Sequence, residues 1–155
     1  MDDNRYAPPK AIVDDAPGTV EAAPALWNPN AAASWCLLFT PIFGTWLHMR
    51  NWTALGQAAK ADAARNWLFA SVGLLVVSTL IALLAPRVPG IRLLNFAFLI
   101  AWYYASAKEQ ARYVLGRFGT KYPRRGWGLP ILIAIGAIVG YVLVLGVLFV
   151  AIGLR

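Results

Sequence analysis

Apolar residues are concentrated in two long stretches of the chain that contain no charged side chain. The first, Trp67 to Ala85, has 19 residues and is followed by Pro86. The second, Leu129 to Leu154, has 26 residues. About 20 apolar residues in a helix cross the roughly 30 Å of hydrocarbon in a bilayer. The pattern therefore predicts two transmembrane helices, and the longer one is expected to tilt.

A third apolar stretch, Leu93 to Ala107, is shorter and lies between Arg92 and Lys108. The long stems of these two basic side chains can reach a membrane interface from either end of the stretch. The preceding link, 86–91, contains two prolines and a glycine, which are typical of a tight turn. The stretch is therefore expected to return through the bilayer as the second arm of a helical hairpin.

The segment Ala31 to Met49 is also apolar, but Pro41 and Gly44 interrupt it near its middle. Proline removes a backbone donor and strains the preceding helical turn. Three structures fit this pattern: a kinked full span, a re-entrant hairpin that breaks between Pro41 and Gly44, or an amphipathic helix on the membrane surface.

Two further segments complete the chain. Residues 1–30 hold five acidic residues and five prolines among small residues, and we predict a disordered acidic tail because so little apolar area can be buried there. Residues 51–66 place apolar side chains at helical spacing, which predicts a short helix on the inner leaflet. The fold class is therefore all-α: residues 31–155 form a polytopic helical membrane domain with three transmembrane helices (67–85, 93–107 and 129–154) and one re-entrant or fourth membrane segment (31–49).

Lysine and arginine counts predict the orientation of this domain. If 31–49 spans the membrane, the loops 50–66 and 108–128 put nine basic residues on one side and leave five on the other. If it does not span, the tail joins the first side and the split becomes eleven against three. Cytoplasmic loops carry the excess of basic residues, so both arrangements place the two loops in the cytoplasm and the C-terminus outside. We prefer three spans with the tail inside.

Composition agrees with a membrane protein, because 59% of the residues are hydrophobic and only 14% are charged. The net charge of +7 would suggest nucleic acid in a soluble protein, but the basic residues lie beside the apolar stretches, where they set orientation and meet anionic lipid. We therefore expect no nucleic-acid partner. The strongest cluster is the candidate contact for anionic lipid or a partner protein, and it consists of Lys108, Arg112, Arg117, Lys121, Arg124 and Arg125.

The chain offers few groups for catalysis. Acid–base chemistry needs titratable side chains in a cleft, and metal sites need clustered ligands. After the tail there are two carboxylates, Asp62 and Glu109, and Glu109 is interpreted as a surface helix partner of Arg112. His48, the one histidine, is expected to make a local hydrogen bond, and Asn95 an interhelical one. We expect no enzyme activity, cofactor or metal.

Small residues recur at four-residue intervals in two of the predicted spans. They are Ala97, Ala101 and Ala105 in the third stretch and Gly136 and Gly140 in the last. Such spacing lets helix backbones approach closely in a membrane. We expect these two helices to pack on each other within one chain in preference to forming a dimer contact.

The segment Leu26 to Gly56 contains Trp27-Asn-Pro-Asn, then Thr40-Pro-Ile-Phe-Gly44, then His48, Asn51-Trp52 and Leu55-Gly56. This block of about thirty residues resembles a block in uncharacterised small bacterial inner-membrane proteins. The resemblance implies a bacterial inner-membrane location and transfers no catalytic or ligand-binding residue.

Together these patterns predict a non-enzymatic accessory, assembly or scaffolding protein of the inner membrane, with membrane lipids and a membrane-protein partner or a second copy as its contacts. Two alternatives remain: an immunity-type protein against a membrane-targeting toxin, and a small channel or transporter subunit.

Overall fold

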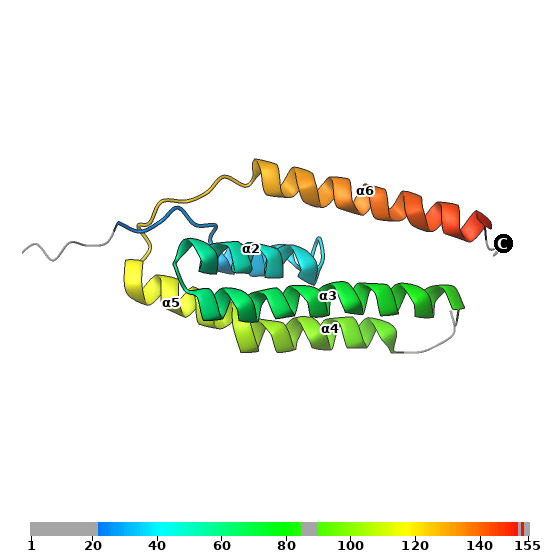
Figure 1. Ribbon diagram of the computed structural model, residues 1–155, viewed down its shortest axis with the longest axis horizontal. Coiled ribbons are helices and arrows are strands. Elements are labelled where there is room, and N and C mark those ends of the chain that lie inside the picture. The colour runs from blue at the N-terminus through cyan, green and yellow to red at the C-terminus, as the bar shows by residue number, and fades with distance from the viewer. Residues whose placement is uncertain (1–21, 85–89, 152, 154–155) are drawn as a thin grey trace, which may run out of the picture.

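The computed structural model describes residues 22–84, 90–151 and 153. Every regular element in these ranges is helical: α1 (Pro29–Trp35), α2 (Pro41–Ala54), α3 (Ala58–Leu84), α4 (Ile91–Trp102), the π-helical segment η1 (Tyr103–Ala107), α5 (Lys108–Phe118) and α6 (Gly128–Ala151). Figure 1 shows the long helices running along one common axis, with α2 between α6 and α3. The predicted all-α fold class is confirmed.

Helices α1 and α2 form an antiparallel hairpin. The Asn28 side chain caps α1 by accepting the N–H groups of Asn30 and Ala31 at 3.0 and 3.3 Å, and Pro29 occupies the first helical position, where no N–H is needed. The middle of α2 contacts the start of α1 through His48, and the first turn of α2 contacts the end of α1 at Gly44.

This hairpin corrects the prediction for Ala31 to Met49. The segment is not one kinked helix, and its break lies at residues 36–40, before the position that we predicted. Pro41 begins α2, because a proline fits the first turn of a helix and not its interior. Gly44 lies inside α2, where the absence of a side chain permits close packing.

Two other predicted boundaries are also wrong. Residues 51–66 do not form a helix of their own, because α2 continues to Ala54 and α3 begins at Ala58 after a turn through Gly56. Gly56 has a φ of 68°, which favours glycine, so the turn falls there. The predicted tail is too long, since Leu26 and Trp27 are only 0% and 7% exposed. Residues 1–21 lie outside the described part of the chain.

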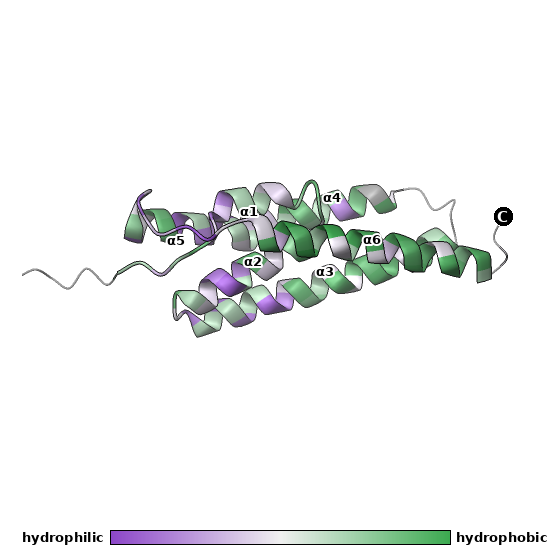
Figure 2. Cartoon of the chain, turned by 90° about the horizontal axis from the view of Figure 1, so that it is seen from above, coloured by the Kyte–Doolittle hydropathy of each residue, from purple (hydrophilic) through white to green (hydrophobic). Residues whose placement is uncertain are grey.

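Helices α3 and α6 are long and apolar enough to cross a membrane. Only 11% of the apolar window of α3 and 6% of that of α6 are buried, so these helices turn their apolar side chains outward, unlike core helices of a soluble protein. Figure 2 shows the hydrophobic residues along α6 and the C-terminal part of α3, and the hydrophilic ones near α5 and the neighbouring ends of α2 and α3. The molecule is therefore polarised along its long axis.

The predicted third span, 93–107, does not correspond to a described helix that is long and apolar enough to cross a membrane by itself. α4 has 12 residues before η1 interrupts the α-helical hydrogen bonding, and 12 residues extend only about 18 Å. α4, η1 and α5 nevertheless follow one another without a break from Ile91 to Phe118. The predicted turn at 86–91 lies mostly outside the described residues.

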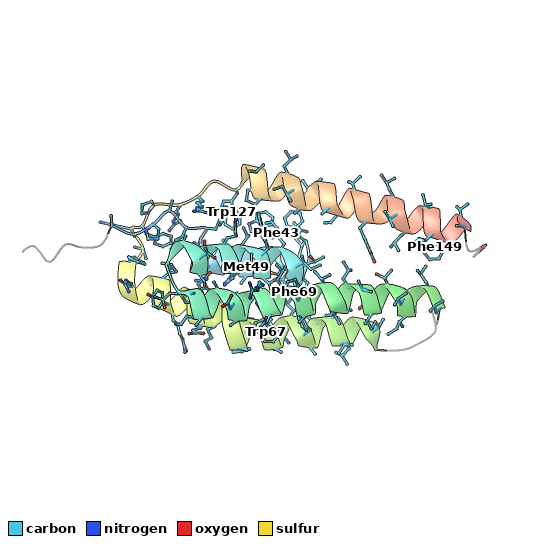
Figure 3. The ribbon with its side chains drawn as sticks, viewed as in Figure 1. Phe43, Met49, Trp67, Phe69, Trp127 and Phe149 are labelled. Atoms are coloured by element: carbon cyan, nitrogen blue, oxygen red, sulfur yellow. The ribbon has the colours of Figure 1, made fainter. Side chains whose placement is uncertain are left out.

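Two small cores hold the helices together. The first contains Trp27, Phe43, Leu47 and Ala134, and it fixes the beginning of α6 against the hairpin. The second surrounds Trp102, which is fully buried against Cys36. Figure 3 shows Trp127 and Phe43 gathered between the start of α6 and α2, whereas Phe149 extends from the far end of α6.

Candidate functional site

The most enclosed polar site of the described chain joins α2, α5 and the segment before α1. The Asn51 side chain accepts the Trp27 N–H at 3.1 Å and donates to the Trp27 carbonyl at 2.8 Å. Asn51 also donates to the Gln110 carboxamide oxygen at 3.2 Å, and Gln110 donates to the His48 carbonyl at 2.8 Å. Asn51, Gln110 and His48, which we call the polar network, are each 0% exposed.

The polar network works as a tie because each buried amide has backbone partners. An asparagine that both accepts from and donates to one residue imitates a neighbouring strand, and it therefore fixes the extended Trp27 against α2. Buried polar groups cost free energy unless they are paired. Each hydrogen bond of the network therefore contributes more to stability than a hydrogen bond on the surface does. The network thus holds three separate parts of the chain in one arrangement.

The segment before α1 is tied on its other side to the link between α5 and α6. Leu26 donates to the Pro123 carbonyl at 3.0 Å and accepts from the Arg125 N–H at 2.9 Å, which makes a short parallel bridge. The Trp27 indole N–H donates to the Gly126 carbonyl at 3.0 Å. The segment is consequently held between α2 and this link.

His48 lies on α2, which is not one of the two helices long enough to cross a membrane. Its hydrogen bond is not the local one that we predicted, because it joins α2 to the start of α1. Its Nε2 is 3.2 Å from the Pro29 carbonyl, which can only accept, so Nε2 carries the proton. Its Nδ1 has no partner among the described residues, and its ring meets Trp102 edge-on at 5.3 Å. Burial lowers the pKa of His48 to about 4. The imidazole is therefore neutral at pH 7 and bonds across the hairpin.

Lys60, on the first turn of α3, is surrounded by α2 and α5. Its Nζ is 2.8 Å from a carboxylate oxygen of Glu109 and 4.8 and 4.9 Å from the ring centres of Trp52 and Tyr113. Glu109 thus pairs with another helix, and the predicted pair with Arg112 is wrong, because the α2–α3 turn brings the ammonium group to it. The ring quadrupoles add to the attraction.

The predicted basic cluster lies at the same end of the molecule. Arg112, Arg117, Lys121 and Arg124 are exposed, and Lys108 and Arg125 are partly buried. Several rest on aromatic rings; the Arg125 guanidinium, for example, is 4.7 Å from the centre of Trp27. Both described carboxylates are paired elsewhere, Asp62 with Arg65 and Glu109 with Lys60. The described part of this face is therefore strongly positive.

The predicted helix-packing residues are not brought together. Ala97, Ala101 and Ala105 are exposed on α4 and η1. A side chain added at Gly136 or Gly140 would meet no atom within 4 Å. The prediction that these residues pack on each other within one chain is wrong, because α6 lies against α2 and not against α4. Their use between two copies stays a prediction.

Polar residues in the apolar helices do make interhelical contacts. Asn95 donates to the Ser78 hydroxyl at 3.1 Å and to the Ile91 carbonyl at 2.9 Å, so its expected interhelical role is confirmed. Thr79 and Tyr141 join α3 to α6 through their hydroxyls at 2.6 Å, a contact that sequence reasoning missed. Such bonds stabilise helix pairs where no water competes.

No arrangement for covalent or metal chemistry is found among the described residues. No three His, Cys, Asp or Glu side chains there lie close enough to hold a metal ion. The network amides do not titrate, and each is bonded to the protein itself. The geometry supports a structural tie beside a basic surface.

Comparison of the chain with known protein families, curated proteins and solved structures gives no significant match.

Proposed function

We propose that the protein is an integral component of a bacterial inner membrane and acts without catalysis, as an accessory, assembly or scaffolding partner. The observation that carries this proposal is the polarity of the molecule: α3 and α6 leave their apolar surfaces uncovered, while the polar network and the basic residues gather at the opposite end. Uncovered apolar surface of this extent requires lipid or another protein. The resemblance of the Leu26 to Gly56 block supports the inner membrane as the location in this proposal.

The third span of this proposal is α4 together with η1. These elements cover 17 residues, or about 26 Å, which a thin or locally thinned bilayer accommodates. The bond from Asn95 to Ser78 supports the assignment because it keeps α4 beside α3 at the depth of its apolar window. The α1–α2 hairpin then enters the membrane with Leu37 and Leu38, which are 72% and 68% exposed, at its tip.

The backbone bridge from Leu26 to Pro123 and Arg125 supports a cytoplasmic N-terminal tail. The link between α5 and α6 carries basic residues that favour the cytoplasmic side. A re-entrant hairpin returns the chain to the side from which it started, so α3 also begins in the cytoplasm. The C-terminus of α6 then lies outside.

Fractionation of cells tests the membrane assignment. We expect the full chain in the membrane pellet, resistant to alkaline carbonate and released only by detergent. A folded, monodisperse chain in the soluble fraction without detergent would contradict it.

Cysteine labelling tests the orientation. In a Cys36→Ala background, which removes the native thiol, we expect an impermeant maleimide to label Arg155→Cys from outside intact spheroplasts and to leave Arg5→Cys unlabelled. Labelling of Arg5→Cys from outside would overturn the cytoplasmic tail.

Isolation in mild detergent followed by mass spectrometry tests the accessory role, for which we expect a stoichiometric membrane-protein partner or a second copy.

A further inference from the structure

A groove of about 340 Å³ lies between α2, α3 and α6. Its walls include Phe43 and Trp46 from α2, Leu68 and Leu75 from α3, and Ile138 and Tyr141 from α6. Its volume falls in the range of about 300–1,000 Å³ that is typical of sites for small ligands. These three helices run along the long axis, so the groove extends in the direction that lipid chains take in a bilayer (Figure 1).

The groove offers few free hydrogen-bonding groups to a polar ligand near Tyr141. Thr79 donates its hydroxyl to the Leu75 carbonyl at 2.7 Å, and the Tyr141 hydroxyl donates to Thr79 at 2.6 Å. Both hydroxyl protons are thereby used, and apart from Thr40 and the indole N–H of Trp46 the other lining side chains are apolar. A polar solute that entered the groove would lose its hydration and gain few new partners, whereas burial of a hydrocarbon chain is favourable.

Two guanidinium groups lie beyond the lining of the groove, on the side of Trp46. Arg50 lies 6.0 Å from the ring centre of Trp46, whose ring is 6.2 Å from that of Trp27. Arg125 lies 4.7 Å from the ring centre of Trp27. Neither guanidinium pairs with a described carboxylate, since Asp62 and Glu109 bind other cations. An apolar channel thus ends beside two available positive charges.

We propose that this groove binds one acyl chain of an anionic glycerophospholipid, with the phosphodiester held by Arg50 and Arg125. The inference rests on the proposed membrane location. It goes further by assigning one lipid molecule to a defined groove, which takes Arg125 from the basic cluster and adds Arg50 from α2. Arginine suits this role because its planar group can bond phosphate at two oxygens while stacked on an indole. The bound lipid would fill the gap between α6 and α3 and so fasten α6, which otherwise packs mainly through its first turns.

Native mass spectrometry of the full chain in detergent, titrated with phosphatidylglycerol or with phosphatidylcholine of the same acyl chains, tests the proposal. We expect one phosphatidylglycerol per chain, bound at least tenfold more tightly than phosphatidylcholine. Each basic residue near anionic lipid contributes about 1 kcal/mol, or about fivefold, so Arg50→Gln with Arg125→Gln should weaken phosphatidylglycerol binding about twenty-fivefold. Ala137→Phe, at an exposed groove residue, should weaken the binding of both lipids.

Matched variants separate this site from general effects. Arg112→Gln with Lys121→Gln removes the same charge from the exposed surface of the basic cluster, and Ala97→Phe adds the same volume on the exposed face of α4. Both should leave the affinity for the single phosphatidylglycerol of the groove unchanged, although the charge variant weakens the looser contact of that surface with anionic lipid. Equal binding of the two lipids, or an equal loss in the Arg112/Lys121 variant, would overturn the proposal. If Ala137→Phe prevents folding, the Arg50/Arg125 comparison decides alone.

Two other results would also contradict the lipid site. Ala137→Phe that folds but leaves lipid binding intact would place the lipid elsewhere. The groove would instead be assigned to a protein helix if the wild type bound no lipid and if Ala137→Phe lost a dimer or a co-purified protein. A chain that needs no detergent would instead refute the membrane assignment, and fractionation reveals this before lipid is added.

Discussion

Asn51 connects three parts of the chain through one side chain. Its carboxamide bonds both backbone groups of Trp27 and the side chain of Gln110, and all three residues are buried. The network is therefore a concentrated source of stability, because removal of one member leaves the others desolvated and unpaired. His48 adds a titratable group to the same region, and Gly44 provides the closest approach of α2 to its neighbours.

Asn51→Ala should lower the free energy of unfolding by about 2–4 kcal/mol, since it leaves the Trp27 backbone and Gln110 without partners. Thermal unfolding in detergent measures the change. Thr53→Ala, on the exposed face of the same helix, removes only a bond to its own helix at Met49 and should change stability by less than about 0.5 kcal/mol. Equal effects of the two substitutions would show that the network does not stabilise the fold.

Gly44→Ala should destabilise the protein by about 1–3 kcal/mol. The added carbon would overlap Cys36 Sγ and lie 2.8 Å from Trp102 Cη2 and 3.1 Å from the Ala32 carbonyl oxygen. Gly73→Ala is the matched control, because a side chain there meets no atom within 4 Å and should stabilise α3 by about 0.5–1 kcal/mol. A chemical denaturation series on both variants should show opposite signs.

His48 should make the fold sensitive to acid. Its pKa is about 4 when folded and about 6.5 when unfolded, so between these values the unfolded chain binds a proton that the folded chain does not. Stability should therefore fall as the pH is lowered from about 6.5 to about 4, by about 3 kcal/mol in total. In His48→Gln this loss of stability should disappear. Denaturant unfolding at a series of pH values measures it, and an equal dependence of the unfolding midpoint on pH in the wild type and in His48→Gln would exclude His48 as the source.

At the scale of elements, the long apolar helices could be predicted and the hairpin could not. α3 and α6 follow from uninterrupted stretches that need no partner to be recognised. The position of the break before Pro41, the docking of Leu26 and Trp27 and the ion pair of Lys60 with Glu109 depend on contacts between residues far apart in sequence. Asn51 and Gln110 were missed because neither residue type signals burial before its partners are known.

Truncations should separate the docked segment from the residues that precede it. Deletion of residues 2–21 removes most of the predicted acidic tail, whose composition offers little apolar area for burial, and should change the free energy of unfolding by less than about 0.5 kcal/mol. Deletion of residues 2–28 also removes Leu26, Trp27 and the cap of α1, and should cost more than about 3 kcal/mol. Limited proteolysis of the two chains in detergent gives the comparison, and equal resistance would mean that the segment is dispensable.

Considered as a whole molecule, the protein separates apolar from basic surface along one axis. Positive charge beside apolar helices determines which side of a membrane a loop occupies. The exposed positions of Arg112, Lys121 and Arg124 leave these charges free to act during insertion as well as in the folded state. In the proposed membrane arrangement, orientation and lipid contact therefore depend on the same surface.

Replacement of Arg112, Lys121 and Arg124 by glutamine should lower the fraction of molecules whose position 155 is labelled from outside, measured in the Cys36→Ala, Arg155→Cys background. The charge-preserving variant Arg112→Lys, Lys121→Arg and Arg124→Lys should be labelled like the parent. Should the glutamine variant retain full labelling, the apolar helices alone would determine the orientation.

The indole bond from Trp27 to Gly126 joins positions 99 apart, and this separation governs the order of assembly during translation. The hairpin leaves the ribosome early, yet its anchor at residues 123–126 is synthesised only after α3, α4 and α5. Closing such a distant contact is slow and must follow the local helices. A nascent chain stalled before residue 126 would therefore contain α3, α4 and α5 but not α6, and Trp27 would still lack its indole partner.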